Sequence, residues 1–128
     1  MRIEWATHWE LREISDDNDA VVWVDLARAD AIWQLDNLYI PAGAPDHRPK
    51  HEKFESWLIK ATERVEMAHV AVSEGNSLSF TNGRHRFAWM RDHSAQAVPF
   101  TIWKGQARRL AKLVGTSLKV CEVKSPAG

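Results

Sequence analysis

The spacing of apolar residues in the first third of the chain predicts a strand followed by a helix. Residues 20–24 (AVVWV) form a short run rich in β-branched side chains, which is typical of a buried strand. Asp25 can cap a helix, and the apolar residues of 26–33 recur at helical spacing. Before them, 1–14 alternate loosely between apolar and charged positions, and 15–19 (SDDND) are turn formers. We therefore expect an edge strand or hairpin arm, a turn, a buried strand and a helix.

The middle of the chain predicts a long loop, an amphipathic helix and a hairpin. Residues 39–50 (YIPAGAPDHRPK) contain three prolines and one glycine, so we expect little regular structure there, and loops of this length are often functional. Apolar residues then recur at i, i+3, i+4 and i+7 within 51–61, which predicts a helix. Two short apolar runs, 68–72 and 77–81, flank Glu74-Gly75-Asn76, the pattern of a β-hairpin.

The last third predicts two more strands and two more helices. A turn at Asn82-Gly83 opens a helix that runs to about His93. A strand follows over 98–102, where Pro99 favours the edge of a sheet. The remaining expected elements are a helix over 106–114 that Gly115 ends, a strand over 119–124, and a frayed tail at 125–128. Together these elements predict one small α+β domain, 1–128, with a short mixed sheet and flanking helices.

Composition adds limits to this picture. The 128 residues include one cysteine, Cys121, which excludes an internal disulfide framework and a thiolate zinc site and fits a reducing cytoplasm. Apolar runs stay far below the roughly 20 residues that a membrane span needs, so we expect no membrane association. Seven tryptophans are present, and most lie in periodic segments, which favours a role in the core.

The formal net charge of zero hides a segregation of charge along the chain. Residues 1–46 hold ten acids and three bases, a net charge of −7, and 47–83 hold five of each. Residues 84–128 hold nine bases and two acids, a net charge of +7. The zero average therefore does not exclude a polyanionic ligand, because the last third is strongly basic.

The basic third contains a candidate phosphate site at the turn before its first helix. Gly83 allows a positive φ and a close backbone approach, and the first N–H groups of the following helix lack partners within it. A helix N-terminus attracts anions, and Arg84, His85 and Arg86 add side-chain donors beside it. Asn82 belongs to the same turn. The alternative is an ordinary surface helix that begins after a common Asn-Gly turn.

Two further groups of residues have functional alternatives. The basic side chains of the last third either track a DNA backbone as one patch or form a solvated face that the acidic third neutralises; they are Arg84, Arg86, Arg91, Arg108, Arg109 and Lys112. His47 and His51 have the spacing of metal ligands on a helix, but Pro49 between them disfavours one helical turn. We therefore expect no metal site there.

A longer motif carries a resemblance to a known superfamily. The run from Thr81 to Ala88 (TNGRHRFA) resembles the phosphate-binding turn and helix of the ParB/sulfiredoxin superfamily. The chain is more similar still to the plasmid fertility-inhibition factors, over about residues 20–103. That resemblance rests on the segments VWVD (22–25), YIPAG (39–43), KHEKF with WL (50–58) and FTNGRHRFAWMRDH (80–93).

The resemblance implies site residues. It places phosphate or nucleotide binding on Asn82, Gly83, His85 and Arg86, to which the chemistry of the turn adds Arg84; His85 and Arg86 are the catalytic candidates. Supporting residues would be Tyr39, Lys50 and Lys53, and the expected DNA-backbone patch is Arg91, Arg108, Arg109 and Lys112. Arg84 stands where sulfiredoxins carry their catalytic cysteine, so sulfiredoxin chemistry is not expected. Ala88 stands where partition proteins carry a second arginine, which disfavours their CTP-dependent behaviour.

The resemblance also implies a function. Fertility-inhibition factors block the transfer of plasmid or oncogenic DNA through type IV secretion, and ATP hydrolysis and DNA cleavage are attributed to their fold. We therefore expect a bacterial cytoplasmic protein that binds nucleotide or DNA, with ATP or another nucleotide and Mg²⁺ as cofactors and slow ATPase or nuclease activity. The main alternative is a catalytically silent module that binds a secretion or coupling protein of a conjugation system. A toxin-like or immunity-like module of mobile DNA is a third interpretation.

Overall fold

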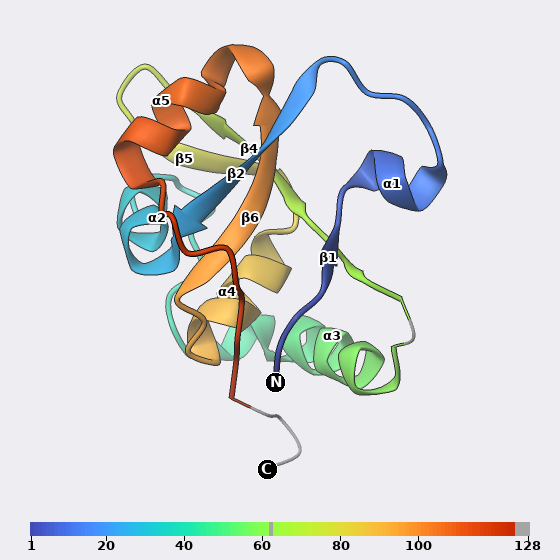
Figure 1. Cartoon of the computed structure of the whole chain (residues 1–128). Coiled ribbons are helices and arrows are strands. Elements are labelled where there is room, and N and C mark those ends of the chain that lie inside the picture. Colours follow the sequence, from blue (N-terminus) through green and yellow to red (C-terminus); the bar gives the residue numbers. More distant parts are fainter. Residues whose placement is uncertain (62, 125–128) are drawn as a thin grey trace.

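A four-stranded mixed sheet forms the centre of the molecule (Figure 1). The computed structural model describes residues 1–61 and 63–124, so the tail expected at 125–128 lies outside the described residues. The strand order is β2 (Asp19–Asp25), β6 (Ala97–Trp103), β4 (Ala68–Val72) and β5 (Leu78–Asn82). The outer pairs are antiparallel and the central pair, β6 with β4, is parallel. The predicted α+β class and the mixed sheet are confirmed.

Three helices close the core over this sheet. Each of α2 (Leu26–Trp33), α4 (Arg84–Asp92) and α5 (Lys104–Val114) buries apolar side chains. Asp25 caps α2 as predicted, because its carboxylate accepts the backbone N–H of Arg28. An aromatic cluster joins α2 and α4 to the sheet, with ring centroids 4.9 to 5.5 Å apart; its members are Trp33, Phe80, Phe87 and Phe100. The apolar periodicity of the sequence therefore identified the core elements.

The N-terminal segment differs from the expected edge strand or hairpin arm. It forms the two-residue strand β1 (Trp5–Ala6) and the short helix α1 (His8–Arg12), and β1 pairs in parallel with β3 (Val65–Glu66). Thr7 and Glu10 form a capping box at the start of α1, which explains the helix. The strand expected over 119–124 was also wrong, since the only pairing found there among the described residues is an isolated bridge from Arg2 to Glu122.

The segment expected to be a loop, 39–50, is partly helical. A 3₁₀ turn covers Pro45–His47, and α3 runs from Arg48 to Lys60. Pro49 stands in the first turn of α3, where a helix needs no donor from proline and the fixed φ suits it. The prediction therefore placed the helix start three residues too late.

Pro99 was predicted at a sheet edge, and this was wrong because β6 is a central strand. On one side β6 pairs with β2, where Pro99 lies opposite Trp23. On the other side the ladder with β4 begins at Phe100, one residue after the proline. The proline therefore sits just outside the β4 ladder, where its missing N–H breaks no hydrogen bond of that pair.

The tryptophans divide between core and surface. Trp33 and Trp89 are fully buried, whereas Trp57 and Trp103 are 40% and 56% exposed. Core filling therefore accounts for some of them and leaves two large apolar side chains facing solvent. Among the described residues, the helices are all too short or too polar to cross a membrane.

Candidate functional site

The turn between β5 and α4 requires glycine. Gly83 caps α4 with φ +86°, in the left-handed region that other residues adopt at a cost. A Cβ built there would lie 2.5 Å from the Cβ and 2.9 Å from the Cα of Ala68. Two constraints therefore fix this residue, the backbone conformation and the close approach of β4.

The N-terminus of α4 is open toward a cavity. No side chain of the described residues caps this helix end. The first backbone N–H of the helix that donates back to the turn is that of Phe87, and it donates to the Gly83 carbonyl. A cavity of about 370 Å³ lies against this end of the helix. Its lining includes all five predicted phosphate-binding residues; the full set is Leu38, Lys50, Phe80, Thr81, Asn82, Gly83, Arg84, His85 and Arg86. Free amides and basic side chains thus meet in one hollow, which suits an anion.

His85 lies in the first turn of α4 with a partly buried side chain. Both of its ring nitrogens are buried and have no hydrogen-bond partner among the described residues. Burial, together with the positive charges of Lys50 and Arg84 and the rings of His47 and His51, lowers the pKa of His85 from 6.5 to about 4. His85 is therefore neutral at pH 7 and holds a lone pair that can accept a proton or bind a ligand.

The two arginines of the motif have different surroundings. Arg84 reaches the loop before α3, where its Nη1 donates to the Leu38 carbonyl at 3.0 Å. Arg86 turns toward β3, where its Nε donates to the Glu66 carbonyl at 3.2 Å and its Nη2 lies 3.8 Å from the Glu66 carboxylate. Burial lowers the pKa of Arg86, and the guanidinium lies 2.8 Å from the place of a Cβ on Gly83. The Arg86 side chain therefore packs against the turn at Gly83.

His47 and His51, which were not expected to form a site, lie close to His85. The start of α3 brings His47 to 5.1 Å and His51 to 6.2 Å from His85, measured between ring centroids. Pro49 was expected to keep His47 and His51 from sharing a helical turn, and this was wrong because proline is tolerated where it stands in α3. Proline is common at the first positions of a helix, so Pro49 was the signal that a helix begins near His47.

The three supporting residues have separate roles in the structure. Lys50 lines the cavity, and Lys53 is exposed on the same helix without lining it. Tyr39 belongs to the core region, where its hydroxyl donates to the Asp30 carboxylate and its ring meets Trp33 edge-on at 4.8 Å. Only Lys50 of these three therefore reaches the cavity.

The residues predicted to form one DNA-backbone patch lie in different places. Arg91 is a correction: its side chain is 8% exposed and forms ion pairs with Asp30 and Asp92 at 3.1 and 2.9 Å. Those pairs raise its pKa against the effect of burial. Arg91 is thus committed to the fold and is not available to a DNA backbone.

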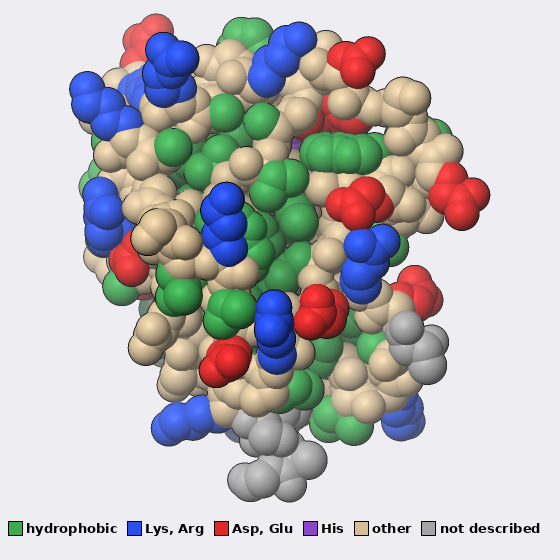
Figure 2. Space-filling view, in the orientation of Figure 1, with side chains coloured by type: hydrophobic (Ala, Val, Ile, Leu, Met, Phe, Trp, Pro, Cys, Tyr) green, Lys and Arg blue, Asp and Glu red, His purple; other side chains and the backbone are tan. Residues whose placement is uncertain are grey.

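The other three members of that patch are on α5. Arg108 and Lys112 are exposed, whereas Arg109 donates to the carbonyls of Ser73 and Glu74 and to the Asn76 amide oxygen at the tip of the β4–β5 hairpin. Lys and Arg side chains gather over α5 in Figure 2. The hairpin tip, which α5 contacts, and Gly83, which lines the cavity, are at opposite ends of β5. The basic face of α5 and the cavity are therefore two separate surfaces.

The acidic first third and the basic last third are in contact but pair few of their charges. Strand β2 of the first third lies beside β6 of the last third along its whole length. Among the described residues, the one carboxylate of 1–46 that forms an ion pair with a Lys or Arg of 84–128 is Asp30, with Arg91. Glu10 pairs with Arg64, and Asp16 with His8. Direct ion pairs therefore neutralise little of the basic charge of the last third.

A sequence model of the family "plasmid fertility inhibition factor" matches residues 21–115. The chain belongs to this family. The match extends from β2 to the end of α5 and contains the whole turn and helix around Gly83. No curated protein matches the sequence.

A solved structure has the same fold. It is the crystal structure of an oncogenic suppression activity protein, described as a plasmid fertility inhibition factor and studied as a gold(I) cyanide derivative. The TM-score is 0.62, the identity is 21%, and the match covers 85% of this chain and 63% of that one. At this identity the likeness shows the fold alone, and it supports the α+β architecture of the fertility inhibition family for this chain.

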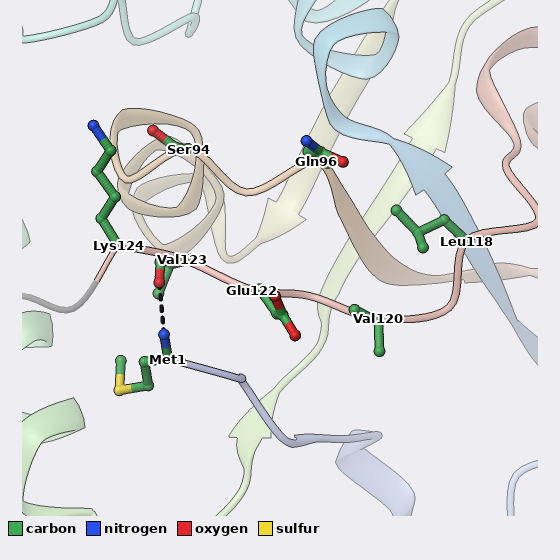
Figure 3. Close-up of a pocket in the computed structure, with 8 residues that line it drawn as sticks. All are labelled: Met1, Ser94, Gln96, Leu118, Val120, Glu122, Val123 and Lys124. Carbon is green, nitrogen blue, oxygen red and sulfur yellow. Dashed lines mark hydrogen bonds between the residues drawn. The ribbon is translucent and has the colours of Figure 1, made fainter.

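This fertility inhibition family member has a second cavity, of about 440 Å³, where the two ends of the described chain meet (Figure 3). The Met1 amino group donates to the Val123 carbonyl at 2.8 Å across it. Leu118, Val120 and Gln96 line its other side. It lies away from the α4 turn and holds none of the predicted site residues.

Proposed function

We propose that this chain is a fertility inhibition factor that binds the phosphate groups of a nucleotide or of DNA at the N-terminus of α4. The observation that supports this most is the cavity of about 370 Å³ in which open helix amides meet Lys50 and Arg84. Through this ligand the protein would block DNA transfer by conjugation and type IV secretion, acting in the bacterial cytoplasm.

Each residue has a distinct part in the proposal. The amides after Gly83 bind the phosphate, and Lys50 and Arg84 neutralise its charge. His85, neutral because its pKa is about 4, is a weak proton acceptor at pH 7 and instead donates its ring N–H to a phosphate oxygen. Arg86 lines the cavity and is a positioning residue, since its Nε donates to the Glu66 carbonyl; its buried Nη2 has no hydrogen-bond partner among the described residues.

The cavity lining limits how Mg²⁺ takes part. Its described residues include no carboxylate, and carboxylate and phosphate oxygens are the ligands that Mg²⁺ prefers. Mg²⁺ would therefore arrive on the phosphates of ATP or another nucleotide, where it neutralises the charge that develops in phosphoryl transfer. This arrangement favours nucleotide hydrolysis over a nuclease that holds its own Mg²⁺ at this site.

The experiment compares Lys50→Ala with Lys53→Ala, two changes on the exposed side of α3 of which one reaches the cavity. ATP, CTP and single-stranded DNA are titrated calorimetrically, with and without Mg²⁺, against both variants and the wild type. We expect Lys50→Ala to weaken binding about tenfold, because a charge-assisted hydrogen bond is lost, and Lys53→Ala to leave it unchanged. Equal affinities in both variants, or no binding by the wild type, would contradict the proposal.

A second candidate is a catalytically silent module that binds a secretion or coupling protein. The observation that favours it is exposed apolar surface: Val21 is 40% and Trp103 56% exposed, and Figure 2 shows apolar side chains along the middle of the face that β2 and β6 present. Conjugation assays in cells separate the two candidates. Under this candidate, Lys50→Ala and Arg84→Ala inhibit DNA transfer as well as the wild type, whereas Trp103→Ser does not.

A further inference from the structure

We propose that His47, His51 and His85 form a binding site for a transition-metal dication such as Zn²⁺ or Co²⁺. The site draws on two helix starts, because His47 precedes α3, His51 lies in its first turn and His85 lies in the first turn of α4. The metal site shares His85 with the phosphate site proposed above, but the ion can bind there without a phosphate.

The spacing of the rings suits shared coordination. The centroid of the His85 ring lies 5.1 Å from that of His47 and 6.2 Å from that of His51. Two imidazoles bound to one zinc ion, each at about 2.0–2.1 Å, place their ring centroids roughly 5 Å apart. The three ligand nitrogens do not yet lie within 4.8 Å of one another. Ion binding therefore requires these side chains to move closer together, and His47 is partly exposed at the start of α3.

Unpartnered nitrogens point to a missing ligand. Both ring nitrogens of His85 and the Nε2 of His51 are buried without a hydrogen-bond partner among the described residues. Buried polar atoms without partners cost free energy, and native structures hold few of them. An ion between the two rings would bind one nitrogen of His85 and the Nε2 of His51, so it would give a partner to two of these three atoms.

His51 has a carboxylate on the side away from its unpartnered Nε2. Its Nδ1 lies 4.0 Å from the Asp92 carboxylate, which is beyond hydrogen-bond distance. Asp92 is itself held by Arg91 at 2.9 Å and by the backbone N–H of Gly43 at 3.4 Å. A carboxylate therefore stands near the ring nitrogen at which metal-bound histidines commonly have an outer partner.

The chemistry of the donors selects the metal. Imidazole nitrogen binds Zn²⁺, Co²⁺ and Ni²⁺ well, whereas Mg²⁺ prefers oxygen ligands. Three histidines leave a fourth position of a tetrahedral ion open. Lys50 and Arg84 stand near His85 and weaken the binding of a bare dication. A phosphate on the open position would offset that repulsion, so phosphate should tighten metal binding.

A competing group of ligands lies elsewhere in the molecule. The ligand atoms of His8, Asp16 and Asp19 lie within 4.8 Å of one another. The Asp16 carboxylate already accepts the backbone N–H groups of Asn18 and Asp19 and pairs with His8 at 3.3 Å. Local hydrogen bonds therefore account for this group, and it serves as the internal control.

The test is a titration of the metal-free protein with Co²⁺, followed by its visible absorption, and with Zn²⁺, followed by calorimetry. We expect one ion per chain for the wild type and for His8→Ala. The affinity should fall at least tenfold in His85→Ala and in His47→Ala. His47 makes no cap hydrogen bond, so its removal leaves the helix start intact. Circular dichroism and thermal melting establish that each variant is folded.

Three results would overturn the proposal: no binding by the wild type at 100-fold excess of metal, equal binding by His47→Ala and the wild type, or binding that is lost in His8→Ala alone. Inorganic phosphate is then added to the metal titration. If metal binds through the histidines and phosphate changes nothing, the metal site stands and the phosphate proposal loses its support. If nucleotide binds and metal does not, the phosphate proposal stands and the metal site is refuted.

Discussion

At the scale of single residues, Gly83 is the position on which the candidate site depends most. It combines a φ of +86° with a place where a Cβ would collide with Ala68. Gly43 has a similar φ of +68°, yet a Cβ there would meet nothing within 4 Å. Comparing alanine substitutions of the two glycines therefore separates the free-energy cost of a positive φ from the cost of the collision with Ala68.

We predict that Gly83→Ala lowers the free energy of unfolding by about 2–4 kcal/mol, since it adds overpacking to left-handed strain. Gly43→Ala should cost about 1–2 kcal/mol, the strain alone. Urea unfolding of both variants measures the difference. Equal losses in the two would show that the contact between the turn and β4 is not tight.

His85 gives a pH dependence whose sign follows from its lowered pKa. Between pH 6.5 and about 4 the unfolded chain binds a proton at His85 and the folded chain does not, so stability falls as the pH falls through this range. In His85→Gln the loss over the same range should be smaller. Chemical denaturation at several pH values, with EDTA present, measures both slopes. Parallel curves for the variant and the wild type would contradict the burial of this ring.

At the scale of elements, α5 holds the β4–β5 hairpin through one side chain. The Arg109 guanidinium donates to two backbone carbonyls and to Asn76, which adopts a positive φ of 62° at the tip of the hairpin. Lys112 lies on the same helix and is exposed. Comparing substitutions of Arg109 and Lys112 therefore distinguishes the effect of the hairpin contact from the general effect of a basic residue on α5.

We predict that Arg109→Ala lowers the free energy of unfolding by about 1–2 kcal/mol, because the hydrogen bonds from a charged group are lost at a partly exposed site. Lys112→Ala should change it by less than about 0.5 kcal/mol. Thermal and urea unfolding provide the comparison. An unchanged stability in Arg109→Ala would mean that the hairpin tip does not need α5.

The elements also show what the sequence could predict. Apolar runs or apolar spacing predicted strands β2, β4, β5 and β6 and helices α2 and α5, whereas the Asn82-Gly83 turn predicted α4. The short strands β1 and β3 have two residues each and carry no period. The start of α3 was missed because Pro49 was taken as a helix breaker, and the central place of Pro99 depends on where β4 begins, which is a long-range fact.

At the scale of the whole molecule, the sequence predicted the turn at Gly83 and missed its surroundings. The motif alone placed Asn82 to Arg86 together, since they are consecutive. Lys50 was expected as a supporting residue, whereas the approach of His47 and His51 depends on how α3 packs against α4. The basic patch failed as a unit because Arg91 is buried and α5 lies at the far end of the hairpin.

The molecule presents basic side chains in two places, the cavity and the exposed face of α5. Binding to either is electrostatic and should weaken as salt is added. Salt dependence alone therefore cannot tell the two surfaces apart, and a measurement resolved by residue is needed.

The most direct test follows backbone amide resonances during titration with inorganic pyrophosphate. The account predicts that the largest chemical-shift changes occur at Gly83, Arg84 and His85, where the open end of α4 meets the cavity, and that they are absent in Gly83→Ala. Changes confined to the α5 residues around Arg108 and Lys112, or no change at saturating pyrophosphate, would contradict a phosphate site at this helix.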